Sequence, residues 1–129
     1  MGIFSRGKYS KIIKNSERQF IQTWNNSLHP DERTADNYFQ TAMMNLFFYA
    51  EKARLDSDDF SKMVFDIRKS SPFHRLIAGV NVNVKKANSD YYSNTYGYYL
   101  SAIREGKNTG EAYIYAAERQ SKLDSTLNL

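Results

Sequence analysis

Helix-breaking residues are scarce in this chain, which holds only two prolines and six glycines among its 129 residues. Both residue types interrupt helices and gather at turns, because proline lacks a backbone donor and glycine is conformationally free. A sheet built on many turns would need more of them. Hydrophobic residues at 41% and charged residues at 25% are close to the averages of globular proteins. We therefore predict an all-α fold, a single domain over residues 1–129 built as a bundle of about six short helices.

The first expected helix spans about residues 10–26, with Ser10 as its N-cap. At about 100° per residue, one side of this helix holds Ile12, Ile13, Ser16, Phe20 and Trp24. The opposite side holds Lys11, Lys14, Arg18, Gln22 and Asn25. The pattern predicts an amphipathic helix, and the polar, proline-containing stretch at 25–31 predicts its end.

The second expected helix, about residues 35–54, is capped by Thr34 and has a broad apolar face. That face holds Ala35, Phe39, Ala42, Met43, Leu46, Ala50 and Ala53. Met44 and Phe48 lie on the other side, four residues apart, and form a second apolar spot. A helix that is apolar on two sides is typical of the middle of a bundle, so we expect this helix to be central. The second spot either packs inside the bundle or forms the seam of a homo-oligomer.

Four shorter helices are expected in the rest of the chain. They cover about residues 58–69 with Ser57 as cap, 72–87 after Ser71, 90–105 before Gly106, and 110–123 with Thr109 as cap. Residues 80–84 also alternate with period two, so an extended segment at 79–86 is the alternative to the fourth helix. The tail, residues 124–129, is expected to fray.

Five of the ten tyrosines lie between positions 91 and 99. On a helix, Tyr92, Tyr96 and Tyr99 share a sector with Leu100 and Ile103, so we assign the three tyrosine rings to the core. Tyr91, Tyr98 and Tyr115 fall toward the outer side of their helices. Exposed tyrosines are frequent anchors in protein interfaces, which makes these three candidate partner-binding residues. The alternative is that they are single surface aromatics without a function.

Positive charge is concentrated near the N-terminus. Residues 1–18 hold five basic residues and one acidic residue, a net charge of +4, whereas residues 19–129 hold thirteen of each and sum to zero. The basic residues, which we call the basic stripe, are Arg6, Lys8, Lys11, Lys14 and Arg18. Such a cluster binds phosphate, anionic lipid or an acidic protein, and its other interpretation is a solvated helix face.

Motifs that carry chemistry are absent from the sequence. Without cysteine the chain has no disulfide, thiolate metal site or Cys nucleophile, and His29 and His74 fit no metal-ligand spacing. The acidic run at 56–59 lacks the glycine and glutamate of a calcium loop. We therefore expect no enzymatic activity, no metal site and no cofactor.

The tripeptide at 29–31, His-Pro-Asp, resembles the motif of J-domain co-chaperones. The chain before it is too short for both helices that precede the motif in that family, so we assign no family. No apolar run reaches the roughly 20 residues of a membrane span, and the N-terminus has no signal-peptide pattern. Together with the missing cysteines, these features favour a soluble cytoplasmic protein.

These observations lead to a hypothesis about function. We expect a small non-catalytic interaction protein, an inhibitor, adaptor or accessory factor, that binds a macromolecular partner, and we favour a protein as that partner. The alternative is a nucleic-acid-binding protein that uses the basic stripe, although the neutral body and the absence of a known motif weigh against it.

Overall fold

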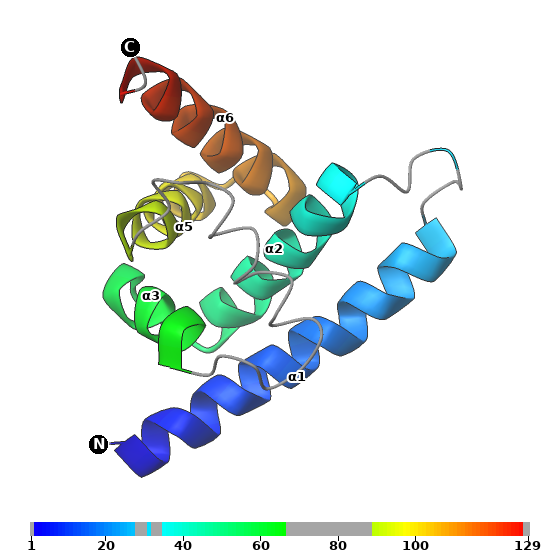
Figure 1. Ribbon diagram of the computed structural model, residues 1–129, viewed down its shortest axis with the longest axis vertical. Helices are drawn as coiled ribbons and strands as arrows, with labels where there is room; N and C mark the ends of the chain where they lie inside the picture. The colour runs from blue at the N-terminus through cyan, green and yellow to red at the C-terminus, as the bar shows by residue number, and fades with distance from the viewer. Residues whose placement is uncertain (1, 28–30, 32–34, 67–88, 128–129) are drawn as a thin grey trace.

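The computed structural model describes residues 2–27, 31, 35–66 and 89–127. All the regular structure in these residues is helical, which confirms the all-α prediction. The five helices are α1 (Gly2–Ser27), α2 (Ala35–Lys52), α3 (Ser57–Asp66), α5 (Ser89–Arg104) and α6 (Thr109–Leu127) (Figure 1). Six helices were expected. The expected helix at 72–87, the alternative extended segment at 79–86 and the cap Thr34 lie outside the described residues.

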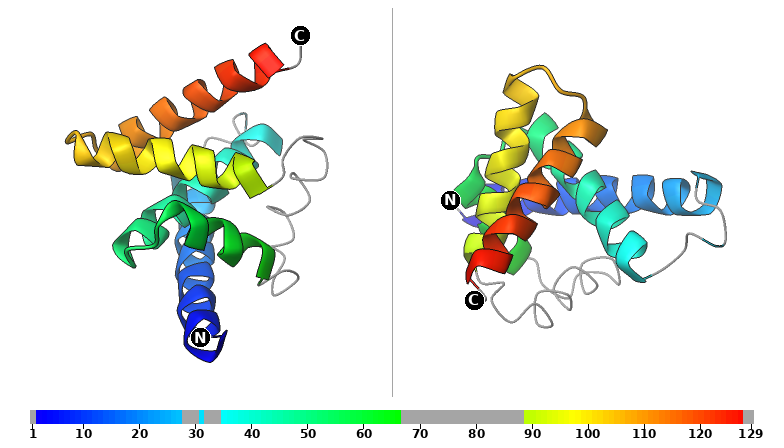
Figure 2. Two further views of the ribbon diagram at one scale, coloured as in Figure 1. Left: turned by 90° about the vertical axis from the view of Figure 1, so that its left-hand side faces the viewer. Right: turned by 90° about the horizontal axis from the view of Figure 1, so that it is seen from above.

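The helices are arranged in three levels, with α2 in the middle. In the left view of Figure 2, α1 is seen nearly end-on at the bottom, α2 and α3 lie above it, and the α5–α6 pair covers them. Contacts join α2 to α1, α5 and α6, while α3 packs mainly on α5. The predicted central position of the second helix is therefore confirmed, and its burial agrees: Thr41, Ala42, Met43, Asn45, Leu46, Phe47 and Ala50 are all buried.

Helix α1 begins eight residues earlier than the sequence predicted. Ser10 was assigned as the N-cap, but the helix already starts at Gly2, so Ser10 lies inside it. Tyr9, which precedes the expected start, is buried with only 5% of its surface exposed. The predicted apolar face is confirmed, because Ile12, Ile13, Ser16 and Phe20 are buried and Trp24 is half-buried. The Ser16 hydroxyl donates to the Ile12 carbonyl at 2.7 Å, which satisfies this polar group inside the core.

Two helix caps lie one residue before their predicted positions. Asp56, not Ser57, caps α3, because its Oδ1 accepts from the Asp59 amide at 2.8 Å. Asn108, not Thr109, caps α6: its Oδ1 accepts from the Glu111 amide at 2.9 Å. Glu111 Oε1 in turn accepts from the Asn108 amide at 3.2 Å, which completes a reciprocal capping box. Helix α6 also continues to Leu127, past its predicted end at 123 and into the tail that was expected to fray.

Helices α2 and α5 end in the same backbone motif with different residues. After α5, the Lys107 amide donates to the Ala102 carbonyl and the Gly106 amide to that of Ile103, around Gly106 at φ 96°. The predicted stop at Gly106 is thus confirmed. After α2, the equivalent left-handed position is held by Arg54 at φ 62°, a conformation that favours glycine.

An aromatic cluster joins four helices around Phe47. This ring, fully buried on α2, lies between 5.1 and 5.5 Å (ring centroids) from the rings of Phe60, Tyr96, Tyr99 and Tyr113. Phe60 and Tyr96 also stack at 4.4 Å. Each such pair contributes about 0.5–1.5 kcal/mol beyond the area that it buries. The cluster therefore fixes α3, α5 and α6 against α2. Tyr96 and Tyr99 are core residues as predicted, whereas the sequence did not identify Phe47.

The turn between α2 and α3 docks on the middle of α5. The Tyr96 hydroxyl donates to the Leu55 carbonyl at 2.8 Å inside the core. One residue along, a Cβ built on Gly97 would lie 3.2 Å from Ser57 Oγ. The missing side chain at position 97 thus lets the start of α3 come close to α5.

Candidate functional site

A basic groove lies between α1 and α2, the two helices that run side by side in Figure 1. Its cavity has a volume of about 250 Å³. The lining residues are Lys8, Lys11, Ile12 and Asn15 from α1 with Tyr49, Lys52 and Ala53 from α2 and its end. Two residues of the predicted basic stripe are thus joined by Lys52, which is 44 residues away from Lys8 in sequence. Tyr49 and Ile12 give the groove an aromatic and an aliphatic wall.

The three lysines of the basic groove carry charge that no described carboxylate neutralises. Lys8, Lys11 and Lys52 are exposed, and none of them forms an ion pair within the described residues. The Lys52 ammonium lies 5.2 Å from the centroid of the Phe48 ring, a cation–π contact that leaves the positive charge in place. The groove therefore presents three positive charges on its rim beside an apolar wall.

The basic stripe continues along α1 beyond the groove. Lys14 and Arg18 are exposed on the same side of the helix, so the stripe from Lys8 to Arg18 extends over about 15 Å. Arg6 lies on the first turns of α1, and its side chain is outside the described part of the structure. The amphipathic arrangement predicted for this helix is confirmed, whereas a partner for the stripe stays a prediction.

Met44 and Phe48, the predicted oligomer seam, are both half-buried but face different neighbours. Phe48 packs edge-on against Tyr49, with ring centroids 5.1 Å apart, and carries Lys52 above it. Met44 lies one turn earlier and lines a second cavity. Phe48 therefore contacts the charged Lys52, whereas Met44 lines a mostly apolar cavity.

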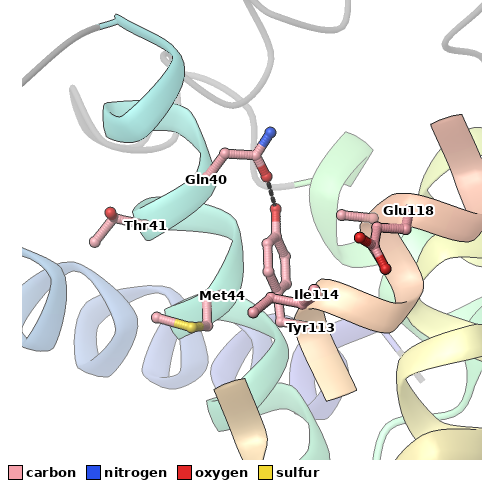
Figure 3. Close-up of a pocket in the computed structure, with 7 residues that line it drawn as sticks. Gln40, Thr41, Met44, Tyr113, Ile114 and Glu118 are labelled. Carbon is pink, nitrogen blue, oxygen red and sulfur yellow. Dashed lines mark hydrogen bonds between the residues drawn. The ribbon is translucent and has the colours of Figure 1, made fainter. Parts of the chain in front are cut away.

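The second cavity, the α2/α6 cleft, has a volume of about 320 Å³. It is lined by Gln40, Thr41 and Met44 from α2 and by Tyr113, Ile114, Ala117 and Glu118 from α6 (Figure 3). The Tyr113 hydroxyl donates to Gln40 Oε1 across the cleft and ties the two helices together. Ile114 is 58% exposed beside this opening. The cleft offers a mostly apolar space with one carboxylate at its edge.

The tyrosines predicted to bind a partner are less exposed than expected. Tyr98 is half-buried, and the Arg119 guanidinium lies 5.0 Å from the centroid of its ring. Tyr115 is also half-buried and packs against the core. Tyr91 lies on α5, and its side chain is outside the described part of the structure. Tyr98 lies beside Thr95 and Ala102, and this flank of α5 is buried because α5 packs against both α3 and α6.

Tyr96 and Tyr99 are buried titratable groups in the described core. No cluster of three or more potential metal ligands occurs among the described residues. Burial raises the pKa of Tyr96, with the negative charge of Glu51 adding to the effect, and burial also raises the pKa of Tyr99. The nearby Thr109 side chain acts in the opposite direction and lowers the pKa of Tyr99. The Tyr99 hydroxyl nevertheless has no hydrogen bond of normal geometry among the described residues. Both phenols lie in the core and are protonated at neutral pH.

Comparison with protein-family models, curated proteins and solved structures gave no match for this chain. The described helices include none that is long and apolar enough to cross a membrane.

Proposed function

We propose that this protein is a non-catalytic interaction protein that binds an acidic segment of a protein partner in the basic groove. It acts by occupying that partner's surface, as inhibitors, adaptors and accessory factors do. One observation carries the proposal: Lys8, Lys11 and Lys52 come together from two helices around Tyr49 without a described carboxylate to neutralise them. The fold thus brings positive charges from the start of α1 and the end of α2, which are far apart in the sequence, into one groove.

The groove combines two kinds of recognition. An exposed ion pair contributes about 0.2–1 kcal/mol, so three lysines together change affinity by about tenfold, and they mainly steer the approach of an acidic partner. Specific binding also needs buried contact area. Tyr49 and Ala53 supply it, because both are only partly buried and a tyrosine ring adds rigid apolar surface with a polar tip. An acidic segment with an apolar side chain between its carboxylates matches this arrangement.

Nucleic acid is the second candidate, supported by the exposed line from Lys8 to Arg18 on α1. We favour protein because the basic groove is built from one face of α1 and the end of α2 (Lys52), whereas nucleic-acid-binding domains usually form a basic face over several elements. The two candidates differ in salt dependence. Duplex DNA gives a log affinity that falls with log salt by about 0.9 per neutralised phosphate.

Fluorescence anisotropy tests the proposal with two labelled probes, an acidic peptide of alternating glutamate and leucine and a DNA oligonucleotide of equal charge. The charge-reversal variant Lys8→Glu, Lys11→Glu and Lys52→Glu should weaken peptide binding by about tenfold or more. Tighter binding of the oligonucleotide, lost in the same variant, would select the nucleic-acid candidate instead.

A matched control variant has the same net charge as the groove variant but carries its three charge reversals elsewhere. Lys62→Glu, Arg104→Glu and Lys122→Glu reverse three exposed charges on α3, α5 and α6, away from the groove. Peptide affinity should change by less than about twofold in this control. If both triple variants lose affinity equally, net charge rather than the groove explains the binding, and the site is wrong.

A further inference from the structure

Two large hydrophobic side chains are exposed on the described surface. Ile21 on α1 is 50% exposed and Ile114 on α6 is 58% exposed. Isolated surface apolar residues are ordinary, so exposure alone decides nothing. What separates these two from ordinary surface residues is their surroundings: Ile114 lines a cavity together with a carboxylate, and Ile21 has exposed basic residues on its side of the helix.

Ile114 borders a space that can receive an apolar side chain. The α2/α6 cleft beside it has about 320 Å³ of volume, and Met44, Ala117 and the ring of Tyr113 make its wall (Figure 3). Glu118 follows Ile114 by one helical turn and lines the same cleft, so the opening carries negative charge. The required ligand is therefore an apolar side chain accompanied by a positive charge.

Ile21 presents that combination. Arg18 lies one turn before Ile21 on α1, and Lys14 lies two turns before it, so both share its side of the helix. All three side chains are exposed. Trp24, half-buried one turn further on, extends the apolar surface next to Ile21. The Ile21 surface thus offers an exposed apolar side chain with basic residues beside it, a charge opposite in sign to that of Glu118 in the α2/α6 cleft.

We propose that two copies of this chain associate by placing Ile21 of one copy in the α2/α6 cleft of the other, with Arg18 opposite Glu118. Both surfaces are present on every chain. A twofold dimer therefore makes this contact twice, while an arrangement that does not close continues into larger assemblies. The interaction uses neither Lys8, Lys11 nor Lys52, so it is separate from the basic groove and does not depend on the function proposed for it.

Sedimentation equilibrium of the full chain, from about 1 μM to about 1 mM, tests the proposal. We expect association that rises with concentration. Ile21→Ser and Ile114→Ser should each weaken it by about tenfold or more, because an apolar anchor is lost. Gln22→Ser, an exposed neighbour of Ile21, should leave it unchanged. A monomer over the whole range would overturn the proposal, as would association that persists undiminished in Ile114→Ser.

A charge exchange tests the pairing itself without removing either isoleucine. Arg18→Glu and Glu118→Arg should each weaken association, and the chain carrying both changes should regain most of it. Circular dichroism of each variant confirms that the helices are intact. No recovery in the double variant would show that these two residues do not face each other. The triple charge reversal in the basic groove should associate as the unmodified chain does.

Discussion

Two tyrosines on neighbouring turns of α5 show that the effect of a buried hydroxyl on stability depends on whether it forms a hydrogen bond. Tyr96 and Tyr99 are both completely buried. The Tyr96 hydroxyl donates to the Leu55 carbonyl at 2.8 Å, whereas that of Tyr99 has no hydrogen-bond partner of normal geometry among the described residues. A satisfied buried hydroxyl stabilises the fold, and an unsatisfied one costs part of its desolvation energy.

Replacing each tyrosine by phenylalanine should therefore have different effects. Tyr96→Phe leaves the Leu55 carbonyl without its donor, and we expect a loss of about 1–2 kcal/mol in the free energy of unfolding. Tyr99→Phe removes an unpaired polar atom and should leave that free energy unchanged within about 0.5 kcal/mol or raise it. Urea unfolding of both variants measures the difference. An equal loss in the two would contradict the hydrogen-bond assignment.

Alkaline pH should act on the same two residues. Burial is the main cause that raises the folded-state pKa of Tyr96 and Tyr99 above the ordinary value of 10.0. Their contribution to stability is thus fully present below about pH 10 and is lost as the pH rises through the folded-state pKa. Because Tyr96 and Tyr99 resist ionisation while the protein is folded, their tyrosinate absorbance should appear only when the protein unfolds. That late absorbance should therefore coincide with loss of the helical circular dichroism signal. Each Tyr→Phe variant should reduce that late absorbance; if neither does, the phenols ionise in the folded protein.

At the scale of whole elements, helical periodicity predicts the faces of α1, α2 and α5 because one turn repeats every 3.6 residues. It predicts the ends less well. Asp56 and Asn108 are the caps although Ser57 and Thr109, which are also good capping residues, follow them directly. Phe47 was missed for another reason: α2 is buried around most of its circumference, so its core residues extend beyond the apolar face that the sequence pattern marks.

The cap correction gives a prediction for α3. Asp56→Ala should lower the free energy of unfolding by about 1 kcal/mol, because the Asp59 amide loses its acceptor. Ser57→Ala should cost less, since Ser57 is not the cap. Thermal unfolding of the two variants gives the comparison. A larger loss in Ser57→Ala would restore the cap that the sequence predicted.

The end of α2 provides a second test at this scale. Arg54 holds the left-handed position at φ 62° that Gly106 holds after α5. Arg54→Gly should raise the free energy of unfolding by about 0.5–1 kcal/mol, because glycine adopts this conformation without steric cost. Gly106→Ala is the reverse change and should lower it by about 1 kcal/mol. Destabilisation by Arg54→Gly would mean that the arginine side chain contributes more than its backbone costs.

At the scale of the whole molecule, the sequence predicts half of the basic groove. Lys8 and Lys11 follow from the charge count and the helical wheel. Lys52 and Tyr49 do not, because nothing in the local pattern shows which turn of α2 packs against the start of α1. The same holds for the α2/α6 cleft, whose residues come from helices about 70 positions apart and depend on packing around Phe47.

The most direct test of the groove is to map it by NMR. The full chain, labelled with ¹⁵N, is titrated with the peptide of alternating glutamate and leucine, and amide shifts are followed. We predict that the largest changes fall on residues of α1 and α2 around Lys8, Lys11, Tyr49 and Lys52, and that they disappear in the triple charge-reversal variant. Changes centred on α5 and α6, or none at saturating peptide, would contradict the account.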